Sequence, residues 1–151
     1  MSSFHFRLET LLRLRLADRD QRRAELAKAQ RAEDTLLAQA DALARERAQM
    51  QERSRRLAEP GTADVDRLIA SHRYELVLRT KAQQLAGQIQ QVRAEVERRR
   101  QIVVEADRQV RVLEKLRERQ QSAFNVREAK HEQKQLDEKA LVGFTYREVP
   151  T

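Results

Sequence analysis

The segment Glu59-Pro60-Gly61 is the one strong interruption of a chain that is otherwise compatible with helix throughout. Proline disfavours helical backbone at the residue before it, and glycine accepts the left-handed conformation that ends many helices. From there to about residue 139 the chain contains no proline. Its single glycine in that stretch, Gly87, costs about 1 kcal/mol relative to alanine and does not force a break. A chain interrupted once in this way is expected to form two long helices.

The residues around this segment predict where the helices end. The first should stop near Leu57 or Ala58, and either Thr62 or Asp64 can cap the second, because their side-chain oxygens accept hydrogen bonds from free amides. The predicted organisation is a single domain over residues 1–151, with a first helix over about 5–58, a turn over 59–63, a second helix over about 64–141 and a flexible tail over 143–151.

Composition agrees with long helices and excludes several other classes. Of 151 residues, 36% are charged and 4% aromatic, with three glycines, two prolines and no cysteine. Turn-forming residues are too few for a compact α/β or all-β domain, and a disulfide scaffold or a cysteine-based metal site is impossible. No stretch approaches the roughly 18 apolar residues of a membrane span, and no apolar signal core is present, so a reducing cytoplasm is expected.

A stripe at steps of three and four residues runs along the predicted second helix. Its members are Leu78, Ala82, Leu85, Ile89, Val92, Val96, Arg99, Val103, Ala106, Val110, Leu113, Arg117, Gln120 and Phe124. A seven-residue repeat sustained over several heptads holds one helix face against a partner helix, so this stripe predicts a coiled coil. The first helix carries half of such a stripe: Ala29, Leu36, Leu43, Met50 and Leu57.

The short turn makes the two helices antiparallel neighbours, so the predicted fold is an all-α, antiparallel two-helix coiled-coil hairpin. The first helix would be about 75–80 Å long at 1.5 Å per residue. Counting outward from the turn places Phe4 near Glu118, and the longer second helix is expected to overhang the first after about residue 120, where the termini meet.

Arg99 interrupts the apolar stripe, and the same counting places it opposite Arg22 and Arg23 of the first helix. Acidic neighbours, among them Glu25 and Glu95, can screen these charges. A loosely packed, hydrated section is therefore expected. Two interpretations stay open: a polar gap tolerated at some cost in stability, or a bending point or contact site.

The residues offer no catalytic or cofactor chemistry. The histidines His5, His72 and His131 lie far apart and form no metal-binding pair, and the isolated glycines form no phosphate-binding loop. A two-helix rod also lacks the concave interior that substrate pockets require. We therefore expect no enzyme activity, cofactor, metal or small-molecule substrate.

The net charge of +7 combines 31 basic with 24 acidic residues that are mixed along the chain. This pattern is typical of a solvated helix surface with ion pairs, and the basic excess favours acidic partners. Nucleic-acid binding stays an alternative, although the interleaved acids and the lack of stacking aromatics disfavour it. Direct membrane-surface binding is not expected, because neither helix joins a basic face to a bulky apolar face.

The two ends of the chain carry motifs that resemble a known family. The pattern F-x-F-R-L-E-x-L-L-x-x-R begins at Phe4, and the pattern E-Q-K-x-L-D-E-x-A begins at Glu132. Both motifs, at the ends of a chain of this length with a central break, resemble FliJ, the small coiled-coil family of the bacterial flagellar type III export apparatus.

The resemblance implies an antiparallel coiled coil similar to the central γ subunit of rotary ATPases, seated in the hexameric ring of the export ATPase, FliI. It also implies contact with the export gate protein FlhA and handling of escort chaperones. The location implied is cytoplasmic, at the flagellar base, with the inner membrane reached only through the gate. The YscO-like stalk of virulence type III secretion systems is the nearest alternative, and a basic coiled-coil scaffold or nucleic-acid-binding protein is a more distant one.

The resemblance also suggests which residues make these contacts. The candidates for the export ATPase are Arg7, Glu9, Arg13, Lys130, Gln133, Lys134, Asp137 and Glu138. The gate contact of the family, an aromatic residue and a leucine early in the second helix, falls on Tyr74 and Leu78. Leu78 is also a member of the coiled-coil stripe, so an ordinary core position is its alternative interpretation. A frayed, solvated helix end is the alternative for the ATPase candidates.

Overall fold

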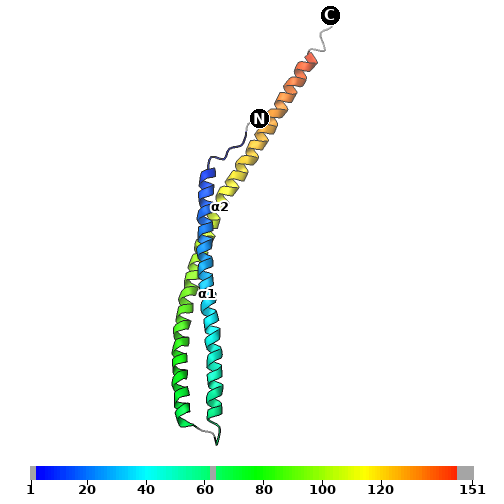
Figure 1. Ribbon diagram of the computed structural model, residues 1–151. Coiled ribbons are helices and arrows are strands. Elements are labelled where there is room, and N and C mark those ends of the chain that lie inside the picture. Colours follow the sequence, from blue (N-terminus) through cyan, green and yellow to red (C-terminus); the bar gives the residue numbers. More distant parts are fainter. Residues whose placement is uncertain (1–2, 62–63, 146–151) are drawn as a thin grey trace. The chain divides into compact units, whose positions relative to one another are not determined.

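The computed structural model describes residues 3–61 and 64–145, with side chains described up to residue 141. Two α-helices account for most of this: α1 over Glu9–Leu57, with 49 residues, and α2 over Val65–Thr145, with 81 residues. No strand occurs within these described ranges. The turn joins two helices that lie side by side, with the chain running in opposite directions along them (Figure 1). The helices pack against each other, which confirms the predicted all-α two-helix hairpin.

The turn between the helices uses the residues that the sequence singles out. Gly61 has a φ of 96°, a left-handed conformation that glycine adopts without a Cβ clash. Asp64 caps α2, because its Oδ1 accepts a hydrogen bond from the backbone amide of Arg67 at 3.1 Å. Asp64 is one of the two predicted caps, and the other, Thr62, lies outside the described residues.

The outer ends of the helices differ from the expected bounds. Helix α1 begins at Glu9, not near residue 5, because the preceding residues pack onto α2 in a non-helical conformation. Helix α2 continues through Gly143 to Thr145, which agrees with the modest cost of a single glycine in a helix. The remaining residues of the predicted tail, 146–151, lie outside the described part of the chain.

The helix pair comprises two compact units, which we describe separately: unit 2, over Asp20–Val104, and unit 1, over Met1–Arg19 with Glu105–Thr151. In unit 2 the buried apolar side chains of α2 are Leu78, Leu85, Ile89, Val96 and Val103. All five belong to the stripe predicted for the second helix, which we call the α2 seam. Helix α1 contributes the buried Ala29 and the half-buried Leu36, Leu43, Met50 and Leu57. The seven-residue repeat therefore locates the core of unit 2 on both helices.

Contacts across unit 2 fix the register of the helices. The hydroxyl groups of Ser54 and Ser71 lie 2.5 Å apart, and Arg99 contacts the backbone of Glu25, two residues from Arg23, at 2.8 Å. Both contacts agree with the register counted from the turn to within a few residues. Side chains on a helix lean toward its N-terminus, which is away from the turn in α1 and toward the turn in α2. Most contacts therefore join an α1 residue to an α2 residue slightly farther from the turn than a simple count gives, as Glu33 and Arg93 do, whereas Glu46 and Tyr74 are offset the other way.

Unit 1 has its own small core, built where the chain precedes α1. Phe6, Leu12 and Val110 are buried together, with Leu16, Leu113 and Leu116 packed around them. The rings of Phe4 and Phe124 lie 5.8 Å apart, centroid to centroid, at an interplanar angle of 52°. Phe4 therefore packs farther along α2 than Glu118, the predicted neighbour. These aromatic contacts hold the N-terminal segment against α2.

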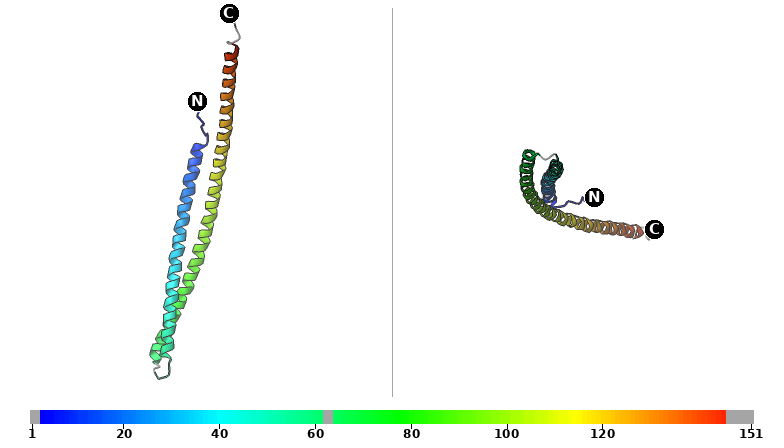
Figure 2. Two further views of the ribbon diagram at one scale, coloured as in Figure 1. Left: turned by 90° about the vertical axis from the view of Figure 1, so that its right-hand side faces the viewer. Right: turned by 90° about the horizontal axis from the view of Figure 1, so that it is seen from below.

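Beyond Phe124, α2 extends past the N-terminal segment of unit 1, as predicted for the overhang (Figure 2). The side chains from residue 125 to residue 141 are all exposed except that of Glu128, which is half-buried. The apolar repeat of the α2 seam stops here, because its next positions are Arg127, His131, Lys134 and Glu138. This helix end has no apolar stripe to bury against α1, so backbone hydrogen bonds and local side-chain contacts, such as that of Gln135 with His131, hold it helical.

Candidate functional site

The predicted ATPase contact falls largely on the exposed end of α2. One face of the helix carries two rows of these residues at steps of three and four: positions 130, 133 and 137, and positions 130, 134 and 138. The residues are Lys130, Gln133, Lys134, Asp137 and Glu138. All five are exposed, and none makes an ion pair or hydrogen bond with another described residue. This face, which we call the terminal face, therefore presents two cations, two anions and an amide to a partner.

The N-terminal candidates lie in the same unit but not beside the terminal face. Glu9 is level with Arg117 of α2, because its Oε2 lies 3.7 Å from the Arg117 Nε. Arg117 precedes Lys130 on α2 by a distance of about 20 Å along the helix, at 1.5 Å per residue. Arg13 lies one turn farther along α1, so the structure groups the N-terminal and C-terminal candidates into two separate surfaces.

The predicted gate contact divides into one exposed and one buried residue. Tyr74 is 41% exposed, and its hydroxyl donates a hydrogen bond to Oε1 of Glu46 at 2.6 Å, which raises the pKa of Tyr74 because the phenolate would repel that carboxylate. Leu78 is 0% exposed and packs in the α2 seam. A direct contact with a partner is therefore open to Tyr74 alone while the helices stay paired.

On the face of α2 opposite Tyr74, exposed apolar side chains lie out of phase with the α2 seam. Val65, Ile69 and Leu76 are all exposed, and their spacing puts them on one face of the helix, turned away from α1. The signal in the sequence is that these residues are apolar but fall outside the phase of the α2 seam. This apolar face lies next to Val77, which is also exposed.

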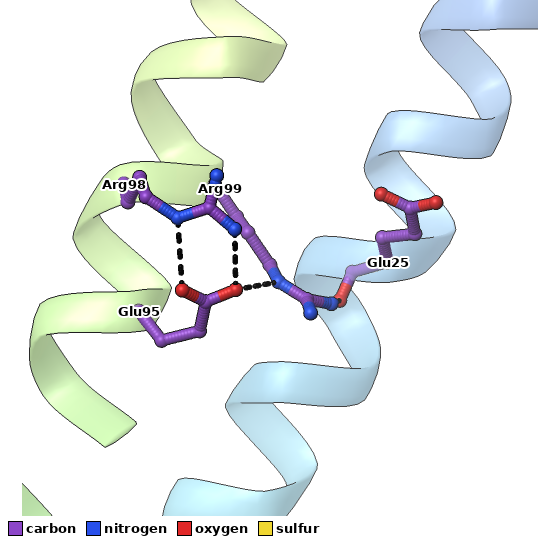
Figure 3. Close-up of polar contacts among 4 residues, drawn as sticks. All are labelled: Glu25, Glu95, Arg98 and Arg99. Carbon is purple, nitrogen blue, oxygen red and sulfur yellow. Dashed lines mark hydrogen bonds and ion pairs between the residues drawn. The ribbon is translucent and has the colours of Figure 1, made fainter. Parts of the chain in front are cut away.

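A polar section interrupts the α2 seam at Arg99, as the sequence predicts. Arg99 donates a hydrogen bond from Nη1 to the backbone carbonyl of Glu25 at 2.8 Å and another from Nε to Oε1 of Glu95 at 2.6 Å (Figure 3). Arg98 donates two more to the Glu95 carboxylate, at 2.9 Å and 2.7 Å. Hydrogen bonds from Arg98 and then Arg99 lower the pKa of Glu95 to about 2. Direct hydrogen bonds therefore replace the loose packing that we expected here.

A layer of small side chains leaves a groove elsewhere in unit 2. Its volume is about 120 Å³, and its walls are Ala40, Leu43, Ala44, Arg47, Ala82, Leu85, Ala86 and Ile89. The Nε of Arg47 is buried at this layer without a hydrogen-bond partner. Alanines at facing positions bring the helices together without filling the space at the edge of the interface.

Neither a metal-binding cluster nor a membrane-spanning helix occurs among the described residues. They include no group of three or more histidine, aspartate or glutamate side chains placed to hold a metal ion. No helix within the described ranges is both long enough and apolar enough to cross a membrane.

Fold and surfaces together define an antiparallel coiled-coil protein with a charged, exposed helix end. A family model described as "Flagellar FliJ protein" matches residues 4–148, so the chain belongs to the FliJ family of flagellar export proteins. Comparisons with curated proteins and with solved structures gave no match.

Proposed function

We propose that this protein is a non-catalytic stalk of the flagellar export apparatus that binds the hexameric export ATPase, FliI, and promotes its ring assembly and ATP hydrolysis. In this proposal it also couples the ATPase to the export gate, FlhA, handles escort chaperones, and so supports flagellum assembly and motility. Its place is cytoplasmic, at the flagellar base, where it meets the membrane only through the gate. Membership of the FliJ family favours a flagellar role over the YscO-like role in virulence secretion.

The observation that carries the ATPase contact is the terminal face of α2. Its charged side chains are exposed and unpaired, and the helix that bears them has no apolar stripe to bury in this chain. A helix end of this kind can enter a ring lined by charged loops, and charge pairs can set its orientation there. Arg7 and Arg13, which are exposed on a separate surface of unit 1, provide a second contact.

The gate contact in this proposal centres on Tyr74, together with the exposed Val77 three residues farther along α2. Tyrosine offers a large apolar ring together with a hydroxyl, a combination enriched at protein interfaces. Leu78 contributes indirectly, because it holds α2 against α1 and so fixes where Tyr74 points. Binding of the gate's cytoplasmic domain should therefore fall in Tyr74→Ala without a matching loss of helix content.

The test of the proposed function is ATP hydrolysis by purified FliI with and without this protein. We expect the wild-type chain to stimulate hydrolysis and ring assembly, and we expect Lys134→Gln with Asp137→Asn to reduce both. A matched control is Glu132→Gln with Lys139→Gln, which also removes one acid and one base from the same helix end but from the opposite face. Absence of stimulation by the wild type, or equal loss in the control, would contradict the proposed ATPase contact.

A further inference from the structure

In unit 1 the face of α2 turned away from α1 carries a second charged surface, which the proposed function does not use. Its members, which we call the outer stripe, are Arg108, Val112, Lys115, Arg119 and Val126. At 3.6 residues per turn these positions stay within about 40° of one line along the helix. They lie about half a turn from the buried Val110, and all are exposed, with Val112 at 60%.

The charges of the outer stripe have no partner among the described residues. Arg108, Lys115 and Arg119 make no ion pair or hydrogen bond with another described residue, although ion pairs are frequent elsewhere on the same helix. Glu105 and Glu118 lie to either side of the stripe and none of its members is acidic. Three positively charged side chains aligned on one helix face create a local positive potential, which favours an anionic partner.

A shallow groove borders the outer stripe and adds apolar surface. It has a volume of about 270 Å³ and is lined by Leu11, Arg15, Glu105, Arg108, Gln109, Val112 and Leu113. Leu11 and Val112 are both exposed there, so an apolar side chain of a partner can contact both α1 and α2 of unit 1. The surface thus combines cations at helical spacing with an adjoining apolar site.

We infer that the outer stripe is a docking surface for an acidic amphipathic helix of a partner protein. Carboxylates at steps of three and four residues on such a helix match Arg108, Lys115 and Arg119, and its apolar residues cover Val112 and the groove. Nucleic acid fits less well, because its phosphates gain nothing from the exposed valines and the adjoining apolar groove. A lipid surface fits less well, because the stripe has no bulky aromatic or leucine side chain.

This inference stands apart from the proposed ATPase contact. The residues of the outer stripe all precede Lys130, and the test of this docking surface uses a peptide probe and no ATPase. The probe is a fluorescent, synthetic helical peptide with glutamate and leucine on one face, compared with a scrambled peptide of the same composition. Binding to the full chain is measured by fluorescence anisotropy at about 50 mM and about 200 mM salt, because charge-driven binding weakens as salt is raised.

The variants separate this surface from the overall basic charge. Arg108→Gln, Lys115→Gln and Arg119→Gln together should weaken peptide binding about tenfold, because three charge contacts are lost at once. Val112→Ser should weaken binding about threefold through lost apolar contact. A matched triple variant, Arg31→Gln, Arg45→Gln and Arg79→Gln, changes the net charge equally at exposed sites of unit 2 and should leave affinity within about twofold of wild type.

Three results would overturn the inference. One is equal binding of the scrambled peptide, which indicates attraction to any polyanion. Another is an equal loss of affinity in the unit 2 control. The third is tighter binding of duplex DNA, or of vesicles containing anionic lipid, with the same loss in the outer-stripe variant. Circular dichroism of each variant at 222 nm checks that the helices remain formed, so a loss of binding reports the surface itself.

Discussion

Replacing Leu78 by alanine separates its two interpretations, a core position and a direct contact for the export gate. Leu78 has no exposed surface in unit 2, so the substitution removes buried methyl groups and leaves a cavity between α1 and α2. Leucine-to-alanine changes in protein cores cost about 2–5 kcal/mol. A two-helix interface is open to solvent along both edges and can partly collapse into the space, so we expect about 2–3 kcal/mol here.

The control for this prediction lies two residues away on the same helix. Leu76 is 50% exposed, so Leu76→Ala makes the same chemical change with little loss of packing and should alter stability by at most about 0.5 kcal/mol. Urea unfolding followed by circular dichroism at 222 nm gives the free energy of unfolding of both variants. A cost below about 1 kcal/mol for Leu78→Ala, or equal costs for the two variants, would refute the assignment of Leu78 to the core.

Four further changes have outcomes that follow from the structure. Gly87→Ala should stabilise α2 by about 1 kcal/mol in urea unfolding, because an added Cβ meets no atom within 4 Å. Glu95 has a pKa lowered to about 2, so the stability it contributes is complete above the unfolded-state value near 4.5 and is lost as pH falls toward 2. The helical signal of the wild type should therefore fall more steeply than that of Glu95→Gln over this range. Phe6→Ala should cost about 3 kcal/mol or more and should speed proteolytic cleavage of the N-terminal segment, because the Phe6 ring is buried in unit 1. The pKa of Tyr74, followed by absorbance at 295 nm, should lie above 10 and return toward 10 in Glu46→Gln.

The α2 seam was predictable because one physical constraint sets it. A helix pair buries a stripe that repeats every seven residues, and the side chains from Leu78 to Val110 meet that condition with Arg99 as the one polar exception. Counting from the turn predicts the register to within a few residues, and the direction in which side chains lean accounts for most of the remaining offset. Arg99, for example, contacts the backbone of Glu25, two residues from Arg23.

The N-terminal segment shows a different limit of the sequence. Phe4 and Phe6 fit a helical pattern as well as an extended one, and only the presence of α2 beside them decides in favour of a non-helical segment packed on Val110 and Phe124. Tertiary contacts override local propensity at such positions.

Among the candidate surfaces, the terminal face was the easiest to predict. The polar continuation of the α2 seam after Phe124 already excludes burial there. The outer stripe and the apolar face of Val65, Ile69 and Leu76 were not predicted, because the seven-residue repeat follows the inward face of α2. Apolar residues out of phase with the seam, such as Val112 and Leu76, are the signal that identifies both surfaces.

The most direct test of the antiparallel hairpin uses the absence of cysteine in the chain. The Ser54 and Ser71 hydroxyl oxygens lie 2.5 Å apart across the helix pair, so Ser54→Cys with Ser71→Cys places two thiols within disulfide reach. On mild oxidation we expect an intramolecular disulfide whose yield does not change with dilution, and no such product from Ser54→Cys with the exposed Leu76→Cys. A disulfide that joins two chains, or no disulfide at all, would contradict the pairing of α1 with α2 on which every surface described above depends.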